Sequence, residues 1–162
     1  MHAVPTFTKL LHVLFDAITK SSTMPIAYLT RRERFASAHR LFQPGLSNDE
    51  NLNLYGQCSH PNWHGHNYEL FVTVRGEVNP QTGFVLNLKT LSNILKAKVV
   101  DKLDHRNLNV DVDFLEGLVP TTENLAIAIW ACIEDDINAM GAKLHCIKVQ
   151  ESENNFIEYR GE

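Results

Sequence analysis

Residues 64–75 alternate between two kinds of side chain, and this alternation constrains the fold more than any other feature of the sequence. The even positions carry His64, His66, Tyr68 and then three aliphatic residues, whereas several odd positions are polar. A period of two is typical of a β-strand with one buried face. We therefore expect a half-buried strand that begins with two histidines on its apolar face.

Elsewhere in the chain, apolar residues recur at intervals of either two or three to four residues, which separates expected strands from expected helices. The expected strands cover residues 26–42, 64–75, 144–151 and 156–159. Helices are expected from about Leu88 to Leu103 and from Thr121 or Thr122 to Gly141, with a polar loop over residues 43–53. This order of elements predicts an α+β fold with an antiparallel sheet and both helices packed on one face.

Composition limits the classes of function. A chain of 162 residues can bury about two-thirds of its unfolded surface in one compact domain. Its 15 basic and 19 acidic side chains give a net charge of -4, which argues against a protein that binds nucleic acid or an anionic membrane through bulk charge. Three cysteines, an odd number, favour free thiols in a reducing compartment, the cytoplasm.

The first 23 residues differ from the rest of the chain. They contain an apolar patch over residues 10–18 that Asp16 interrupts, and this patch is too short to span a membrane. Secretory signals and organelle transit peptides both fit the segment poorly. We expect residues 1–23 to be a mobile or peripheral extension, and residues 24–162 to form the domain.

The strongest chemical signal is the pair His64 and His66. Alternate residues on a strand point to the same face about 6.5 to 7 Å apart, so both imidazoles can bind one metal ion. His39 ends the preceding strand and would lie beside the pair if the two strands are neighbours. Three imidazoles without a fourth protein ligand are typical of a catalytic zinc site. The alternative is that these are ordinary core and strand-end histidines; His60 is an additional potential ligand.

Cys58 lies six residues before His64 and has three possible roles. It could be a fourth metal ligand, a small buried apolar residue, or a thiolate base, because a nearby dication would favour the thiolate. The other two cysteines, Cys132 and Cys146, fall in an expected helix and an expected strand. Their positions favour a packing role.

Acidic residues provide two further candidates. Asp104 precedes His105 and could orient its imidazole for proton transfer, although a histidine near a helix C-terminus can simply interact with the helix dipole. Glu151 has the same parity as Ile147 and Val149, so its carboxylate would point to the apolar face and require a partner. A ligand with two adjacent N–H groups would be suitable. The alternative is a strand-end glutamate that turns to solvent.

Together these motifs resemble the 6-pyruvoyl tetrahydropterin synthase family, from about Pro25 to Glu162. The combination is highly specific, although each motif alone is not. The matching segments are Ser37–Leu41 (SAHRL), Gly56–Cys58 (GQC), His64–Tyr68 (HGHNY), Leu103–His105 (LDH), Pro120–Asn124 (PTTEN) and Glu151–Asn155 (ESENN). Two residues depart from the family pattern: Ala36 replaces a common serine, and Trp63 replaces a usually small residue.

The resemblance implies a role for each candidate residue. It implies one zinc ion per chain, held by His39, His64 and His66, and a proton-transfer set of Cys58, Asp104 and His105. Glu151 would anchor the pterin ring, with Thr121 and Thr122 nearby. The family fold is a four-stranded antiparallel sheet with two helices, which assembles into barrels as trimers paired into hexamers. Sites lie between subunits, so Asp104 and His105 would reach Cys58 from a neighbouring chain.

The resemblance also implies a reaction. A zinc-dependent lyase would convert 7,8-dihydroneopterin triphosphate to 6-pyruvoyl tetrahydropterin with loss of triphosphate, in tetrahydrobiopterin biosynthesis, and Mg²⁺ would accompany the phosphates. Arg40, Lys102 and Arg106 are the candidate phosphate-binding cations. Two alternatives remain: a 6-carboxytetrahydropterin synthase, and a pterin-binding zinc module without turnover. The spacing between Cys58 and His64 and the long loop before Cys58 favour the pyruvoyl enzyme.

Overall fold

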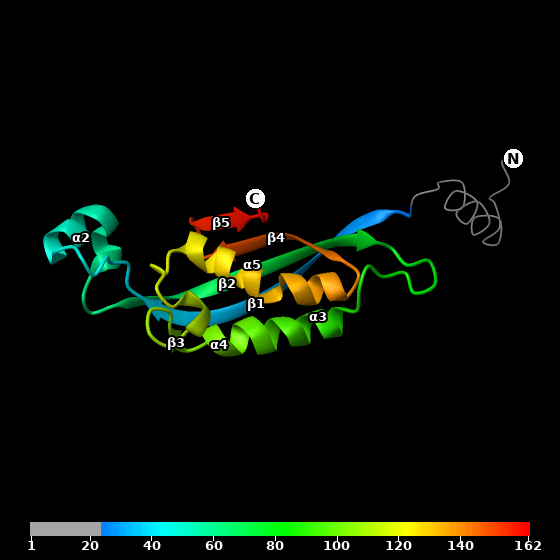
Figure 1. Ribbon diagram of the computed structural model, residues 1–162, viewed down its shortest axis with the longest axis horizontal. Coiled ribbons are helices and arrows are strands. Elements are labelled where there is room, and N and C mark those ends of the chain that lie inside the picture. The colour runs from blue at the N-terminus through cyan, green and yellow to red at the C-terminus, as the bar shows by residue number, and fades with distance from the viewer. Residues whose placement is uncertain (1–23) are drawn as a thin grey trace, which may run out of the picture.

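The computed structural model describes residues 24–162, so the predicted extension, residues 1–23, lies outside the described part of the chain. Five strands form one sheet in the order β3-β1-β2-β4-β5. The strands are β1 (Ile26–His39), β2 (His64–Glu77), β3 (Arg106–Asn107), β4 (Lys143–Gln150) and β5 (Phe156–Tyr159). The α-helices are α2 (Asn48–Tyr55), α3 (Leu88–Leu95), α4 (Asp101–Leu103) and α5 (Thr122–Ala139). Figure 1 shows the elongated sheet with helices against it.

β1 and β2 form the long antiparallel pair at the centre of the sheet. They are in register over their whole length, from Ile26 opposite Glu77 to His39 opposite His64. The even positions of β2 from Tyr68 onward are buried, which confirms the predicted period of two. The segment between the two strands carries α2, which lies at one end of the molecule (Figure 1).

The prediction of four antiparallel strands is wrong in one respect: the sheet has a fifth strand and is mixed. β3 is only two residues long and runs parallel to β1. The backbone N–H of His105 donates to the Ala36 carbonyl, and that of Leu108 donates to the Ala38 carbonyl. Two residues are too few to produce a recognisable alternation in the sequence. This strand therefore depends on the loop after α4 meeting the edge of β1.

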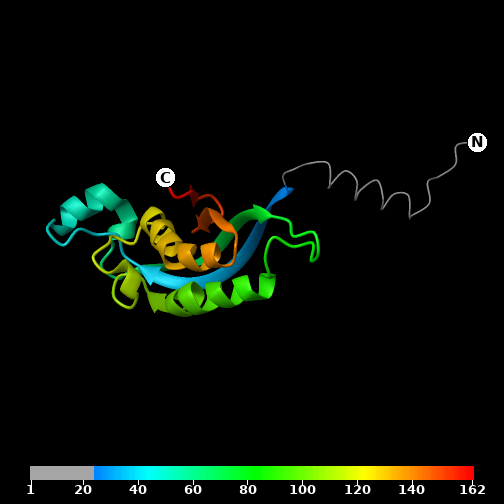
Figure 2. The same ribbon diagram turned by 45° about the vertical axis from the view of Figure 1, so that its right-hand side comes forward.

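Both predicted helical regions lie on one face of the sheet, as Figure 2 shows in a turned view. The first continues from α3 through a π-helical stretch, Lys96–Val100, into α4 and ends at Leu103 as expected. Thr121 caps α5 by accepting a hydrogen bond from the Asn124 N–H. Gly141, with φ of 83°, follows the end of α5. Buried residues from α3, α5 and the inner face of β2 and β4 form one core.

Residues 43–53, predicted as a polar loop, include most of α2. Ser47 caps this helix with a capping box, in which its side chain accepts from the Glu50 N–H while Glu50 accepts from the Ser47 N–H. Asn51, the buried residue of α2, donates to loop carbonyls including that of Gln43. The helix was missed because its leucines point to solvent and give no apolar periodicity. Leu52 and Leu54 are 49% and 60% exposed.

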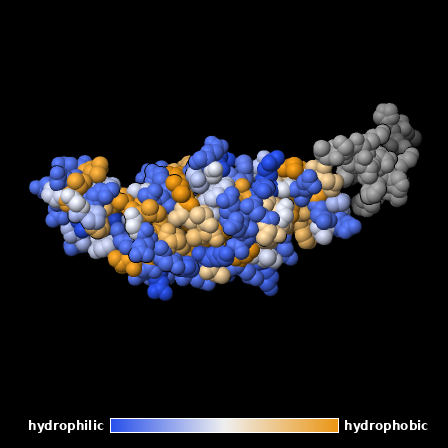
Figure 3. All heavy atoms as spheres, viewed as in Figure 1, coloured by the Kyte–Doolittle hydropathy of each residue, from blue (hydrophilic) through white to orange (hydrophobic). Residues whose placement is uncertain are grey.

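The face in Figure 3 is mainly hydrophilic, with apolar residues exposed in several separate places. The exposed large apolar residues of the described chain are Ile26, Tyr28, Leu46, Leu52, Leu54, Phe84, Leu88, Val110, Leu118, Ile127 and Phe156. No helix within residues 24–162 is long and apolar enough to cross a membrane.

We predict that Ser47→Ala destabilises α2 locally. Loss of the cap should cost about 1 kcal/mol and speed amide exchange in the helix about fivefold, because exchange there follows local opening. Hydrogen exchange with mass spectrometry measures this change. Ser47→Asn keeps a side-chain cap and serves as the control, with exchange close to wild type. Equal exchange in wild type and Ser47→Ala would show that the cap does not stabilise α2.

Candidate active site

The three histidines predicted to bind a metal ion lie together at the α2 end of the β1–β2 pair. His39 is directly opposite His64, and Ser37 is opposite His66. The imidazole centroid of His39 lies 4.5 Å from that of His64 and 5.2 Å from that of His66. One ring nitrogen from each histidine lies within 4.8 Å of the others. The prediction that His39 lies beside the pair is therefore confirmed.

Four ring nitrogens of this cluster lack hydrogen-bond partners. Within residues 24–162, the buried side-chain nitrogen and oxygen atoms without a partner are Nε2 of His39, both ring nitrogens of His64, and Nε2 of His66. Burial lowers the pKa of all three imidazoles, so they are neutral at pH 7 and keep free lone pairs. Unpartnered buried polar atoms are costly. Three converging neutral imidazoles fit a zinc ion with an open fourth position.

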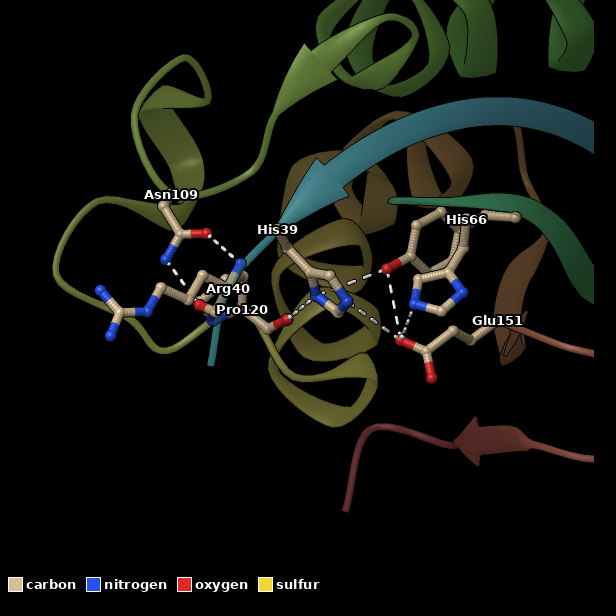
Figure 4. A network of polar contacts seen from close by, with 7 residues as sticks. His39, Arg40, His66, Asn109, Pro120 and Glu151 are labelled. Carbon is tan, nitrogen blue, oxygen red and sulfur yellow. Dashed lines mark hydrogen bonds and ion pairs between the residues drawn. The ribbon is translucent and has the colours of Figure 1, made fainter. Parts of the chain in front are cut away.

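The Pro120 carbonyl orients the His39 ring. His39 is 1% exposed, and its Nδ1 lies 3.0 Å from the carbonyl oxygen of Pro120 (Figure 4). A carbonyl can only accept, so Nδ1 carries the hydrogen and Nε2 presents its lone pair to the cluster. The hydrogen bond to Pro120 therefore fixes both the tautomer and the direction of the His39 ring. No local pattern in the sequence indicates this contact, because the proline is 81 residues away from His39.

Glu151 points into the same cluster from the end of β4 (Figure 4). Its Oε1 lies 3.5 Å from His39 Nε2 and 3.6 Å from His66 Nε2, and it accepts a hydrogen bond of 3.4 Å from the Tyr68 hydroxyl. Burial and the Glu151 charge raise the pKa of Tyr68, which stays protonated. Neutral histidines cannot form ion pairs with Glu151. The Glu151 carboxylate and the lone pairs of the imidazole nitrogens would therefore be stabilised by a cation between them. No role was predicted for Tyr68, although its even position places it on the same face of β2 as His64 and His66.

Cys58 is half-buried on a 3₁₀ turn, Gly56–Ser59, that precedes β2. Burial raises the pKa of its thiol, and the negative charge of Glu151 raises it further. The Leu41 N–H donates a hydrogen bond of 2.9 Å to the Cys58 carbonyl, so the turn lies beside the segment that follows His39. In the chain without a bound cation the thiol is therefore protonated at neutral pH. Cys132 and Cys146 are also free thiols, and Cys146 is buried.

Asp104 and His105 form a close pair at the edge of the sheet. Asp104 Oδ2 lies 2.9 Å from His105 Nδ1, while Oδ1 accepts from the Ala36 N–H. Adjacent residues can meet here because His105 has a left-handed backbone, with φ of 58°. The Ala36 and His105 hydrogen bonds lower the pKa of Asp104. None of the hydrogen bonds or ion pairs of this exposed pair reaches Cys58 or the histidine cluster within the described chain.

The two predicted threonines and the two departures from the family pattern have other structural settings. Thr121 caps α5, and Thr122 is its first residue, so both follow directly on the carbonyl that orients His39. Trp63, immediately before His64, adopts a left-handed backbone with φ of 63°. A bulky residue is unfavourable there, whereas glycine is not. Ala36 stands where the family commonly has serine, so its side chain is only a methyl group. Its backbone N–H donates to Asp104.

The three candidate phosphate-binding cations have different surroundings. Lys102 forms an ion pair of 2.7 Å with Asp113. Arg106 is exposed on β3 and, with His105, lines an open cavity of about 540 Å³. The Arg40 side chain instead donates to the carbonyl of Ser59, at 2.7 Å. Of the three, only Arg106 lies with a predicted catalytic residue in one cavity.

Comparison with known proteins agrees with this architecture. A family model described as 6-pyruvoyl tetrahydropterin synthase matches residues 28–162. The 6-pyruvoyl tetrahydrobiopterin synthase of Dictyostelium discoideum is 49% identical over 134 residues, covering 83% of this chain and 96% of the relative. The human protein of the same name is 43% identical over 136 residues, covering 84% and 92%.

A solved structure gives the same result. That of Caenorhabditis elegans 6-pyruvoyl tetrahydropterin synthase superimposes with a TM-score of 0.79 at 37% identity, covering 86% of this chain and 98% of the other. The family match covers every candidate site residue and, except for the first two residues of β1, every described strand and α-helix. The chain therefore belongs to the 6-pyruvoyl tetrahydropterin synthase family.

Proposed function

We propose that this protein is a 6-pyruvoyl tetrahydropterin synthase, a lyase that converts 7,8-dihydroneopterin triphosphate to 6-pyruvoyl tetrahydropterin and triphosphate. The observation that carries the proposal is the convergence of three neutral histidines, one buried and two half-buried, beside Glu151. The names of the relatives, at 43% and 49% identity, support the same activity.

The proposed metal is zinc, held by His39, His64 and His66, one ion per chain. A bound zinc ion would act as a Lewis acid on the side-chain hydroxyls of the substrate and acidify neighbouring C–H and O–H bonds. The fit rests on the unpartnered nitrogens of the cluster and on the Pro120 contact that directs His39. Glu151 is proposed to anchor the pterin ring through adjacent N–H groups, with Thr121 and Thr122 nearby.

Cys58 and the Asp104–His105 pair are proposed to move the protons. The raised pKa of Cys58 reflects burial and a carboxylate in a chain without a cation. Positive charge in the histidine cluster would oppose both effects and favour the thiolate that proton removal requires. His105 would handle the second transfer, with Asp104 fixing its Nδ1 hydrogen at 2.9 Å.

Assembly is proposed to complete the site. The Asp104–His105 pair is exposed and makes no polar contact with Cys58 within one chain. A neighbouring subunit could present its own pair to Cys58 if sheets join edge to edge into a barrel. The apolar residues on the surface in Figure 3 are compatible with subunit contacts. We propose a homohexamer, built as a dimer of trimers.

The triphosphate is proposed to bind with Mg²⁺, and Arg106 is the candidate cation with the most suitable surroundings, because it shares a cavity with His105. The free state of all three cysteines supports a reducing compartment, and we propose the cytoplasm. Residues 24–162 are proposed to be the functional domain. A 6-carboxytetrahydropterin synthase and a pterin-binding module without turnover are the alternatives that product analysis must separate.

Metal content gives the first test. We expect about one zinc ion per chain in purified protein and loss of most of it in His39→Ala, because two imidazoles do not replace three. Elemental analysis after gel filtration measures the ratio. His60→Ala is the matched control, since His60 is an exposed histidine outside the cluster. Equal zinc content in wild type and His39→Ala would overturn the proposed ligand set.

Product mass gives the second test. Wild-type protein incubated with 7,8-dihydroneopterin triphosphate and Mg²⁺ should release triphosphate and yield a product with the mass of 6-pyruvoyl tetrahydropterin. Cys58→Ala should lower kcat by about 100-fold or more while zinc stays bound, because a proton acceptor is lost. Cys132→Ala is the control and should remain active. A 6-carboxytetrahydropterin product would favour the first alternative, and bound pterin without product the second.

Mixed assembly gives the third test. Cys58→Ala and His105→Ala chains, each inactive alone, should recover about a quarter of the wild-type rate when they are co-assembled in equal amounts, because one site in four then receives both intact residues from different chains. Turnover by the mixture measures this recovery. Doubly substituted Cys58→Ala/His105→Ala chains mixed with either single variant provide the control. No recovery from assembled mixed oligomers would place the two residues in the same subunit's site.

A further inference from the structure

The Arg40 side chain joins the end of β1 to the turn that carries Cys58. Its Nε donates a hydrogen bond of 2.7 Å to the carbonyl oxygen of Ser59, the residue next to Cys58. Its Nη2 donates to Asn48 Oδ1 at 3.4 Å. The guanidinium also stacks over the Phe42 ring, with 4.5 Å from the guanidinium carbon to the ring centroid. Three contacts in different directions hold this side chain in one position.

The backbone around Arg40 is held as firmly as its side chain. Its N–H donates to Asn109 Oδ1 and its carbonyl accepts from Asn109 Nδ2, both at 2.9 Å (Figure 4). The next residue, Leu41, donates its N–H to the carbonyl of Cys58, also at 2.9 Å. The Cys58–Ser59 segment is therefore bound to residues 40 and 41 by one backbone bond and one arginine bond.

The direction of the side chain argues against a role in binding the substrate's phosphates. Figure 4 shows the Arg40 guanidinium pointing away from His39 and the cluster. Its Nε is used by a backbone carbonyl, and one face of its plane is covered by Phe42. Arginine suits such a site because its planar group offers directed donors and stacks on an aromatic ring, which lysine cannot reproduce.

We infer that Arg40 is a positioning residue for Cys58: it fixes the turn Gly56–Ser59 against the end of β1 and so sets the distance between the thiol and the histidine cluster. His39, which precedes Arg40, is itself a cluster residue, so one short segment sets both parts of the site. The effect of Arg40 on turnover rests on the proposed function, whereas its effect on the position of the Cys58 turn is independent of that function.

The test combines turnover with the chemical reactivity of Cys58. Arg40→Lys keeps the charge but loses the Nε donor and the planar stack, so the turn should loosen. Alkylation of Cys58 by iodoacetamide at fixed pH, followed by peptide mass spectrometry, should become about threefold faster or more, because local opening exposes the thiol. In the turnover assay, kcat should fall about 10-fold or more with KM within about twofold, because positioning rather than binding is lost.

Two further variants sharpen the result. Phe42→Leu removes the ring under the guanidinium and should raise Cys58 alkylation by an intermediate amount, which keeps a test available if Arg40→Lys does not fold. Arg34→Lys is the matched control, because Arg34 is exposed and pairs with Glu69 at 3.2 Å. Its Cys58 alkylation should equal that of wild type. Circular dichroism and thermal melting confirm that each compared protein is folded.

The outcomes separate this inference from the proposed function. Unchanged Cys58 alkylation in folded Arg40→Lys and Phe42→Leu would overturn the positioning role. If Arg40 instead bound the triphosphate, Arg40→Gln, which removes the charge, would raise KM strongly and leave Cys58 alkylation unchanged. That result would also overturn the positioning role. Faster alkylation in a protein whose wild type shows no turnover would support the positioning of Cys58 while the proposed function fails.

Discussion

The antiparallel register between β1 and β2 is the constraint on which the candidate site depends. Because His39 is paired with His64, a shift of one residue would turn one histidine to the opposite face and separate the cluster. The register is held by the buried face of the same strands, where Phe35 stacks on Tyr68 with centroids 5.0 Å apart. Gly65 assists: a Cβ there would lie 3.0 Å from the Ser37 carbonyl oxygen. The same β1–β2 register therefore sets both the packing of the core and the positions of the histidines.

The charges and lone pairs of the cluster suit a cation. Burial keeps the three imidazoles neutral, and the Glu151 carboxylate lies against the nitrogens of two of them. The same carboxylate raises the pKa of both Cys58 and Tyr68. A positive charge among these groups would attract the Glu151 carboxylate and would oppose the rise in the pKa of Cys58 and of Tyr68. The three histidines are therefore a group that could hold a metal ion.

The groups around the cluster come from segments that are distant in sequence but end at the same edge of the fold. The Pro120 carbonyl directs His39 from the start of α5, and Asn109 holds the backbone of Arg40 from the loop after β3. On the side of β1 that pairs with β3, the Ala36 N–H donates to Asp104 and the His105 N–H donates to the Ala36 carbonyl. His105 nevertheless lines one open cavity with His66, a member of the histidine cluster.

The sequence alone determined the main strands and helices, because periods of two and of three to four residues record which face of each element is buried. It also predicted the convergence of His39, His64 and His66 on the condition that their two strands are neighbours, and the structure meets that condition. Only the tertiary structure decided that the sheet is mixed and five-stranded and that residues 48–55 form a helix, because β3 is too short and α2 too exposed to leave a pattern. It alone showed the Pro120 contact to His39 and the Arg40 contact to Ser59, because each is a single contact between separate segments that no local period encodes.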